Sequence, residues 1–262
     1  MSEAETGDSE QPLMAHLLEL RARVLTAVAA WFIGMIICYN FANEIYAFLV
    51  EPLAQGFEQG EARRLIYTSL TEAFFTYIKL AFWAGFFLAF PVIALQFYRF
   101  VAPGLYKHEK GALLPYLIIS PLLFFAGAAL AYYGVMPMAW QFFIGFEEMD
   151  PTLGLPIQLE AKVSEYLGLV MQILFAFGLA FQLPIVLTLL ARIGLITSEA
   201  LAKKRRYAVI GIITAAALLT PPDIISQIGL FIPLYLLYEI SIICCRIMQR
   251  KHEENQEAEA DA

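Results

Sequence analysis

Two carboxylates stand out in this sequence because each lies beside long apolar segments. Glu19 belongs to "HLLELRARV" (residues 16–24), which runs directly into the uncharged stretch "LTAVAAWFIGMIICYNF". Arg23 follows Glu19 by four residues, the spacing of a helical ion pair that contributes only about 0.2–0.5 kcal/mol. Glu109 lies in "APGLYKHEK", close to two lysines. The residues alone leave two interpretations for each carboxylate: a local surface charge, or a binding site for a positively charged group.

Two further polar residues lie within or beside apolar segments. Gln182 is inside "AFGLAFQLPIVL", and an amide in hydrocarbon needs polar partners, which a helix interface or a wet cavity supplies. Pro184 removes the helical hydrogen bond to the carbonyl of Ala180, which predicts a kink there. Asp223 follows two prolines in "LLTPPDIISQ" and is predicted to cap the helix that comes next. Gln182 therefore has either a packing role or a place in a polar groove.

The composition is that of a polytopic membrane protein. Hydrophobic residues make up 60% of the chain and charged residues 16%, against roughly 45–50% and 25% in soluble domains. The three cysteines and three histidines lack metal-ligand spacing, and no glycine-rich phosphate loop is present. We therefore expect no metal, no cofactor and no nucleic-acid partner.

The fold class predicted from these segments is all-α, with six transmembrane helices. The apolar segments span residues 24–41, 74–98, 113–135, 166–190, 208–220 and 224–245. Prolines within them predict kinked helices that form a concave groove, and the fifth and sixth spans are predicted to be short. The segment "NEIYAFLVEPL" predicts a further helix in the first outer connection. The expected division is a disordered acidic tail (1–12), a membrane domain (13–247) and a disordered C-terminal tail (248–262).

Positive charges predict the orientation. Most of the 17 Lys and Arg residues fall in the N-terminal segment, the second and fourth connections and the C-terminal tail. Because positive residues favour the cytoplasmic side, both termini are predicted to be cytoplasmic.

Several strings together resemble the TatC family, the core subunit of the twin-arginine protein translocase. They are "QPLMAHLLELRARV", "EPL", "TEAFFTYIKLAF", "FVAPGLYKHEK", "FQLPIVL", "KKRRYAVI" and "LLTPPDIISQ". They occur in the family's order over about residues 11 to 247. The resemblance implies a non-enzymatic receptor in the bacterial inner membrane. With the small single-span subunits TatA and TatB it exports folded proteins, using the protonmotive force, and it assembles into a homo-oligomer within the complex.

The resemblance also implies roles for individual residues. Glu19 and Glu109 match the two cytoplasmic carboxylates that recognise the Arg-Arg pair of signal peptides, and Arg21 matches the "ELR" arginine, which is implied to position Glu19. A guanidinium presents a planar fork that carboxylate oxygens accept and lysine cannot copy.

The remaining matches are structural or depart from the family pattern. Pro52 matches the outer-loop proline, and Asp223 matches the "TPPD" aspartate, for which we retain the capping role. Gln182 stands where many members carry glutamate. Because an amide does not titrate, no proton-carrying role is expected at this position.

Three other functions remain to be compared with this one. A small secondary transporter would show internal symmetry, and an intramembrane enzyme would need paired catalytic groups at membrane depth; the sequence has neither feature. An assembly factor without a transport role is separable only by complementation of a translocase-deficient strain.

Overall fold

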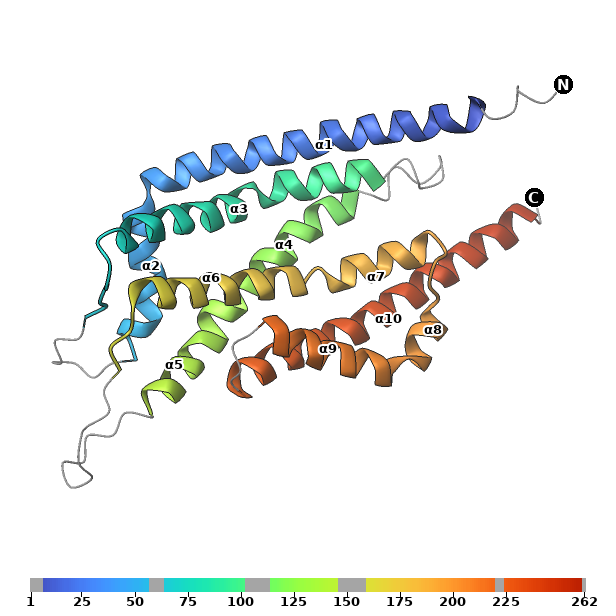
Figure 1. Cartoon of the computed structure of the whole chain (residues 1–262). Coiled ribbons are helices and arrows are strands. Elements are labelled where there is room, and N and C mark those ends of the chain that lie inside the picture. The colour runs from blue at the N-terminus through green and yellow to red at the C-terminus, as the bar shows by residue number, and fades with distance from the viewer. Residues whose placement is uncertain (1–6, 57–63, 102–113, 146–158, 220–223, 261–262) are drawn as a thin grey trace. The chain divides into compact units, whose positions relative to one another are not determined.

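The structure, a computed structural model, describes residues 7–56, 64–101, 114–145, 159–219 and 224–260 (Figure 1). The described residues are almost entirely helical. They form two compact units, of which unit 1 comprises Met1–Ile45 and Tyr77–Pro121 and unit 2 comprises Tyr46–Thr76 and Leu122–Ala262.

The predicted spans correspond to helices. Five described stretches are long and apolar enough to cross a membrane, namely His16–Asn40, Glu72–Phe100, Pro115–Ile144, Val163–Arg192 and Ile224–Arg250. The fifth predicted span is α9 (Arg205–Leu219), whose 15 residues rise only about 22 Å, so the prediction of a short helix is confirmed. The sixth predicted span is the first part of α10 (Ile224–Ala260), a helix of 37 residues, and is longer than predicted.

Both ends of the chain contain more helix than the composition predicted. α1 (Gly7–Asn40) begins within the expected N-terminal tail, and α10 continues into the expected C-terminal tail. The C-terminal residues are rich in Glu, Gln, Lys and Ala, which have high helix propensity. Helix can therefore extend from the apolar spans into these polar segments, although low hydrophobicity had predicted disorder.

Unit 1 is built on α1 and α3 (Glu72–Val101), which lie side by side (Figure 1). Their backbones touch at Gly34 and Gly85, since a Cβ added to Gly85 would lie 2.5 Å from the amide nitrogen of Met35. Close to this point, Trp31 donates its Nε1–H to the carbonyl of Phe82 at 2.9 Å. Small residues allow two membrane helices to approach closely, so this glycine pair sets the spacing of α1 and α3.

Unit 2 contains most of the remaining helices. They are α2 (Ala42–Ala54), the second part of α4 (Leu114–Leu130), the π-helical turn η3 (Ala131–Val135), α5 (Met136–Ile144), α6 (Val163–Ala180), α7 (Leu183–Arg192), α8 (Ser198–Lys203), α9 and α10. α2 confirms the helix predicted in the first outer connection. α10 packs against α7, α8 and α9.

The break between α6 and α7 confirms the kink predicted from Pro184. α6 ends at Ala180 and α7 begins at Leu183. The turn between them is closed by two backbone hydrogen bonds, from Phe181 to the Phe177 carbonyl at 3.0 Å and from Gln182 to the Leu179 carbonyl at 2.9 Å. The missing N–H of Pro184 thus ends one helix and starts the next.

Candidate functional site

In unit 1, Glu19 lies at the polar end of the α1–α3 pair. Arg23 donates from Nη2 to Glu19 Oε1 at 3.0 Å and from Nη1 to Gln96 Oε1 of α3 at 3.3 Å. The ion pair predicted from the four-residue spacing is therefore present, and it is tied to the neighbouring helix. The side chain of Glu19 remains 33% exposed, so the carboxylate is oriented and still accessible to a ligand.

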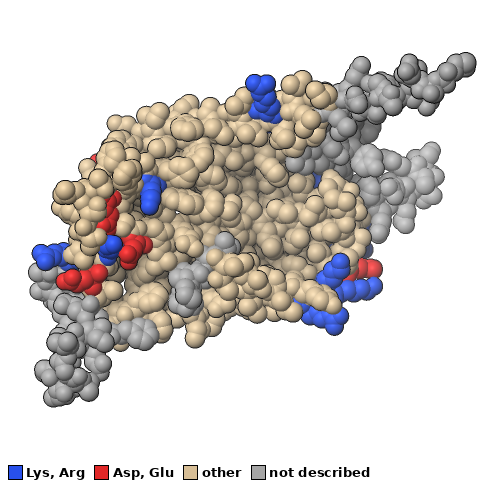
Figure 2. All heavy atoms as spheres, in the orientation of Figure 1, with Lys and Arg blue, Asp and Glu red and all other residues tan. Residues whose placement is uncertain are grey.

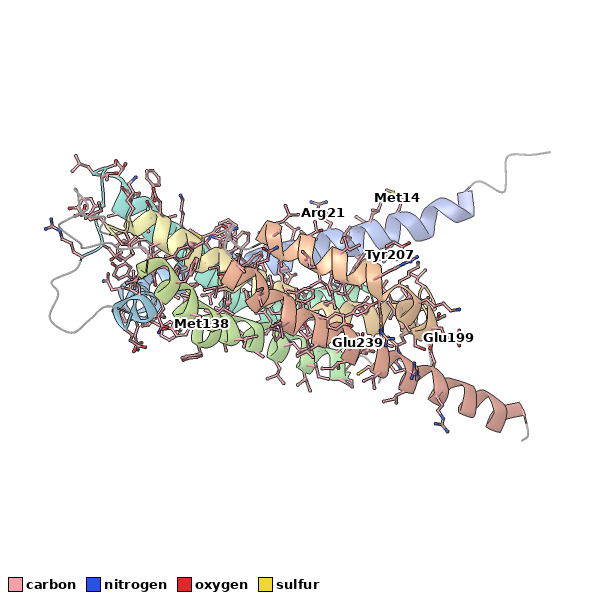
Figure 3. The ribbon with its side chains drawn as sticks, turned by 90° about the horizontal axis from the view of Figure 1, so that it is seen from below. Met14, Arg21, Met138, Glu199, Tyr207 and Glu239 are labelled. Carbon is pink, nitrogen blue, oxygen red and sulfur yellow. The ribbon has the colours of Figure 1, made fainter. Side chains whose placement is uncertain are left out.

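Arg21, which the resemblance linked to Glu19, has a different place. It is exposed on α1 (Figure 3), whereas the hydrogen bond to Glu19 comes from Arg23. The difference has a geometric reason, because residues four apart share a helix face and residues two apart do not.

A ring contact holds α1 to α3 one turn before Glu19. His16 stacks on Phe100, with ring centroids 4.4 Å apart and planes inclined by 21°. Phe100 lies near the end of α3. The second predicted carboxylate, Glu109, lies outside the described residues and stays a prediction.

Gln182 lies in unit 2, on the wall of a groove of about 420 Å³ between α6–α7, α9 and α10. The other residues that line the groove are almost all apolar; they include Leu179, Leu183, Ile212 and Leu234. Gln182 thus lines an apolar groove, and its backbone also takes part in the turn before α7. This groove agrees with the concave surface predicted from the kinked helices.

Pro52 occupies the middle of α2, and the structure shows how its missing N–H is compensated. A proline leaves the carbonyl four residues earlier, here that of Phe48, without a helical donor. Tyr132 donates its hydroxyl to this carbonyl at 2.6 Å, and its ring stacks on Phe48 at 4.3 Å. Tyr166 donates in the same way to the adjacent carbonyl of Leu49 at 2.8 Å. Two hydroxyl groups therefore fasten α2 within unit 2.

Two other expectations concern Asp223 and metals. Asp223 lies outside the described residues, immediately before α10, so its capping role stays a prediction. Within the described ranges, no group of three or more His, Cys, Asp or Glu side chains could hold a metal ion.

Sequence reasoning missed Gln96 and Tyr132, which are partners of predicted residues. Gln96 was detectable as an amide inside an apolar span, by the same criterion that identified Gln182. Tyr132 was detectable only in part. Pro52 indicates that the Phe48 carbonyl needs a donor, but it does not indicate which of the 13 tyrosines supplies it.

The chain is similar to one known protein family, to its members and to a solved structure. The model of the family "Sec-independent protein translocase protein (TatC)" matches residues 15–233. The TatC protein of Rickettsia prowazekii is 48% identical over 94% of this chain and 97% of its own length. The TatC protein of Escherichia coli is 38% identical over 95% of this chain and 94% of its own length. A crystal structure described as the twin arginine translocase receptor TatC has a TM-score of 0.74 and 39% identity, covering 88% of this chain and 98% of its own.

Proposed function

Because the chain belongs to the TatC family of Sec-independent protein translocases, we propose that Glu19 and Glu109 bind the arginine pair of twin-arginine signal peptides. The protein is a non-enzymatic, membrane-spanning component of the twin-arginine translocase in the bacterial inner membrane. Its similarity to a TatC receptor structure supports a role in which precursor proteins are bound before transport.

The observation that carries the proposal is the geometry of Glu19. Arg23 donates from Nη2 to Oε1 of Glu19, and Gln96 accepts from Nη1 of the same guanidinium. The orientation of the carboxylate is therefore restrained, while the side chain stays one-third exposed. An arriving guanidinium can form charge-assisted hydrogen bonds here, each contributing roughly 1.5–3 kcal/mol.

Two such carboxylates explain why arginine is preferred to lysine. A guanidinium offers several N–H donors in a fixed plane, and an ammonium group offers donors from a single point. Suppose that Glu19 and Glu109 each accept one arginine. Replacement of both arginines by lysine then removes the match between a planar guanidinium and a carboxylate at both sites. The discrimination between Arg-Arg and Lys-Lys is then the product of two modest preferences.

The assembly of the complex belongs to the same proposal. The single-span helix of TatB contacts α9 and its neighbourhood, TatA lies near α10, and several copies of this chain form the working complex. Both termini face the cytoplasm, which places Glu19 and Glu109 on the side where precursors arrive. Gln182 provides a polar point on the groove wall and carries no proton.

The proposal is tested in a strain whose only copy of the gene encodes Glu19→Gln, Glu109→Gln or both. One reporter is a prefolded protein behind an Arg-Arg signal peptide, and a second uses the general route for unfolded proteins. We expect a loss of more than about tenfold in export of the folded reporter for each single variant, since one charged hydrogen bond corresponds to at least this factor. Export of the second reporter should not change.

Glu199→Gln is the matched control, because Glu199 is an exposed glutamate on the same predicted side of the membrane. Membrane levels of all variants are measured by immunoblot. Normal export of the folded reporter by the double variant at normal protein level would contradict the assignment of both carboxylates.

A further inference from the structure

Four consecutive basic residues, 203–206, lie where α8 passes into α9 in unit 2, and Figure 2 shows blue side chains gathered there. Arg205 is neutralised by Glu239 of α10, with Nε–Oε1 and Nη2–Oε2 distances of 2.8 and 2.9 Å. This contact raises the pKa of the Arg205 guanidinium above its ordinary value. Lys203, Lys204 and Arg206 are exposed, and within the described part of the chain no ion pair neutralises them.

The acids around these three cations leave the cluster positive. Glu199 lies one turn before Lys203 on α8, and Glu239 is already paired with Arg205. Figure 3 shows both carboxylates and Tyr207 at the same end of unit 2. Arg206 lies over the ring of Tyr207, 4.8 Å from its centroid. A net positive patch therefore remains, with an aromatic ring at its edge.

The next residues of α9 place this patch at the boundary of the hydrocarbon region. Tyr207, Ile210 and Ile213 are 60%, 62% and 43% exposed, so an apolar surface begins directly after Arg206. Tyrosine and basic side chains are enriched at this level of a membrane, where one end of the side chain is apolar and the other is hydrated. The three cations are thus at the height of phospholipid headgroups.

The groove described above begins one turn beyond the same patch. Its α9 wall consists of Ala208, Gly211, Ile212 and Ala215. The amide of Ala208 donates to the carbonyl of Lys204 at 3.0 Å, which places the groove directly after the cluster. A Cβ added to Gly211 would meet nothing within 4 Å, so the space beside α9 is open.

We propose that unit 2 binds an anionic phospholipid, with its negatively charged headgroup at the positive patch that contains Lys203, Lys204 and Arg206 and one acyl chain in the groove beside Gly211. The charge of the patch selects a headgroup with net negative charge over a zwitterionic one. The apolar lining accepts a hydrocarbon chain, and Gln182, which lies between α6 and α7, lines the groove. This site depends on the membrane-spanning fold and not on recognition of the arginine pair.

The test uses purified, delipidated full-length protein in neutral detergent, titrated with phosphatidylglycerol and, separately, with phosphatidylcholine that has the same acyl chains. Native mass spectrometry counts the bound lipids. We expect phosphatidylglycerol to bind at least about tenfold more tightly, since each basic residue contributes roughly fivefold to the binding of an anionic lipid. The preference should weaken as salt concentration rises.

Two variants test the binding of the lipid headgroup and the binding of the acyl chain separately. Lys203→Gln/Lys204→Gln/Arg206→Gln should abolish the preference for phosphatidylglycerol, and Lys203→Arg/Lys204→Arg should retain it. Gly211→Leu fills the open space without a backbone clash and should reduce binding of both lipids. Gly168→Leu is its control, because Gly168 also has nothing within 4 Å of an added Cβ. Arg64→Gln/Lys79→Gln/Lys162→Gln removes three charges outside α8, α9 and α10 and should not change the preference.

Three results would overturn the proposal. The first is equal affinity for the two lipids, and the second is an unchanged preference in the triple glutamine variant, provided that helix content and thermal stability are normal. The third comes from titration with a synthetic TatB transmembrane helix. If Gly211→Leu weakens binding of that helix and leaves lipid binding unchanged, the groove belongs to a partner helix and not to an acyl chain.

Discussion

α1 and α2 follow each other in the chain and are held by different means. α1 is held along α3 by contacts within unit 1, namely the glycine contact at Gly34 and Gly85, the Trp31 hydrogen bond and the ring of His16 on Phe100. α2 is held in unit 2 by hydroxyl groups from Tyr132 and Tyr166, which lie 84 and 117 residues beyond their acceptors in the sequence.

The two modes of attachment correspond to the polar groups that each helix carries. α1 is attached along one face, and only 11% of its apolar span is buried, against 50% for the span formed by α6 and α7. Its polar end keeps a carboxylate, that of Glu19, which is one-third exposed. In α2 the polar groups that matter are backbone carbonyls, and both are satisfied by partners inside unit 2. We infer that α1 carries a binding group, whereas α2 is part of the scaffold.

The largest expected effect comes from separating α1 and α3. In Gly85→Leu the Cβ alone would lie 2.5 Å from the Met35 amide and 2.6 Å from its Cα, and backbone atoms cannot move aside as a side chain can. We expect a loss of about 3 kcal/mol in stability and a loss of export of the Arg-Arg reporter. Detergent-titrated unfolding of the purified protein measures the first, and Gly168→Leu, which meets no neighbour, is the control. A stable, active Gly85→Leu protein would show that the glycine contact does not hold α1.

A smaller loss of stability is expected from substitutions in and beside α2, and a double variant tests its cause. Tyr132→Phe leaves the Phe48 carbonyl without a donor, which costs about 1–3 kcal/mol for a buried group. Pro52→Ala restores the helical N–H that can bond to the same carbonyl. The loss of stability caused by Tyr132→Phe should therefore be smaller in a protein that also carries Pro52→Ala.

The four proteins of this cycle are compared by unfolding and by export of the folded reporter. If the stability changes of Tyr132→Phe and Pro52→Ala simply add in the double variant, the Tyr132 hydroxyl does not replace the hydrogen bond that Pro52 lacks. Tyr133→Phe is the control, because Tyr133 is the exposed neighbour of Tyr132.

The smallest effect on stability is expected beside Glu19, where two arginines can be compared. Arg23→Gln removes a helical ion pair of about 0.2–0.5 kcal/mol and one hydrogen bond to Gln96 of about 1 kcal/mol, so the loss of stability should be small. Because Arg23 orients Glu19 and Arg21 does not contact it, Arg23→Gln should lower export of the Arg-Arg reporter severalfold, and Arg21→Gln should lower it less. The reverse order would return the positioning role to Arg21, as the family resemblance implies.

Local patterns predicted much of the fold because the forces involved act over one or two helical turns. Apolar segments predicted the spans, Pro184 predicted the break between α6 and α7, and the position of Arg23 predicted its ion pair with Glu19. The ends of α1 and α10 were predicted less well, since a helix extends through polar residues of high propensity once its apolar part is formed.

The sequence by itself determined the membrane-spanning class, the kink at Pro184 and the carboxylate at the end of α1, since each depends on residues within a few positions of one another. The tertiary structure alone decided that Gln96 supports Arg23 and that Tyr132 compensates for Pro52. Such partners depend on which faces of distant helices meet. In an α-helix a shift of one residue rotates a side chain by about 100°, and the π-helical turn that contains Tyr132 alters this register in a way that residue spacing does not reveal.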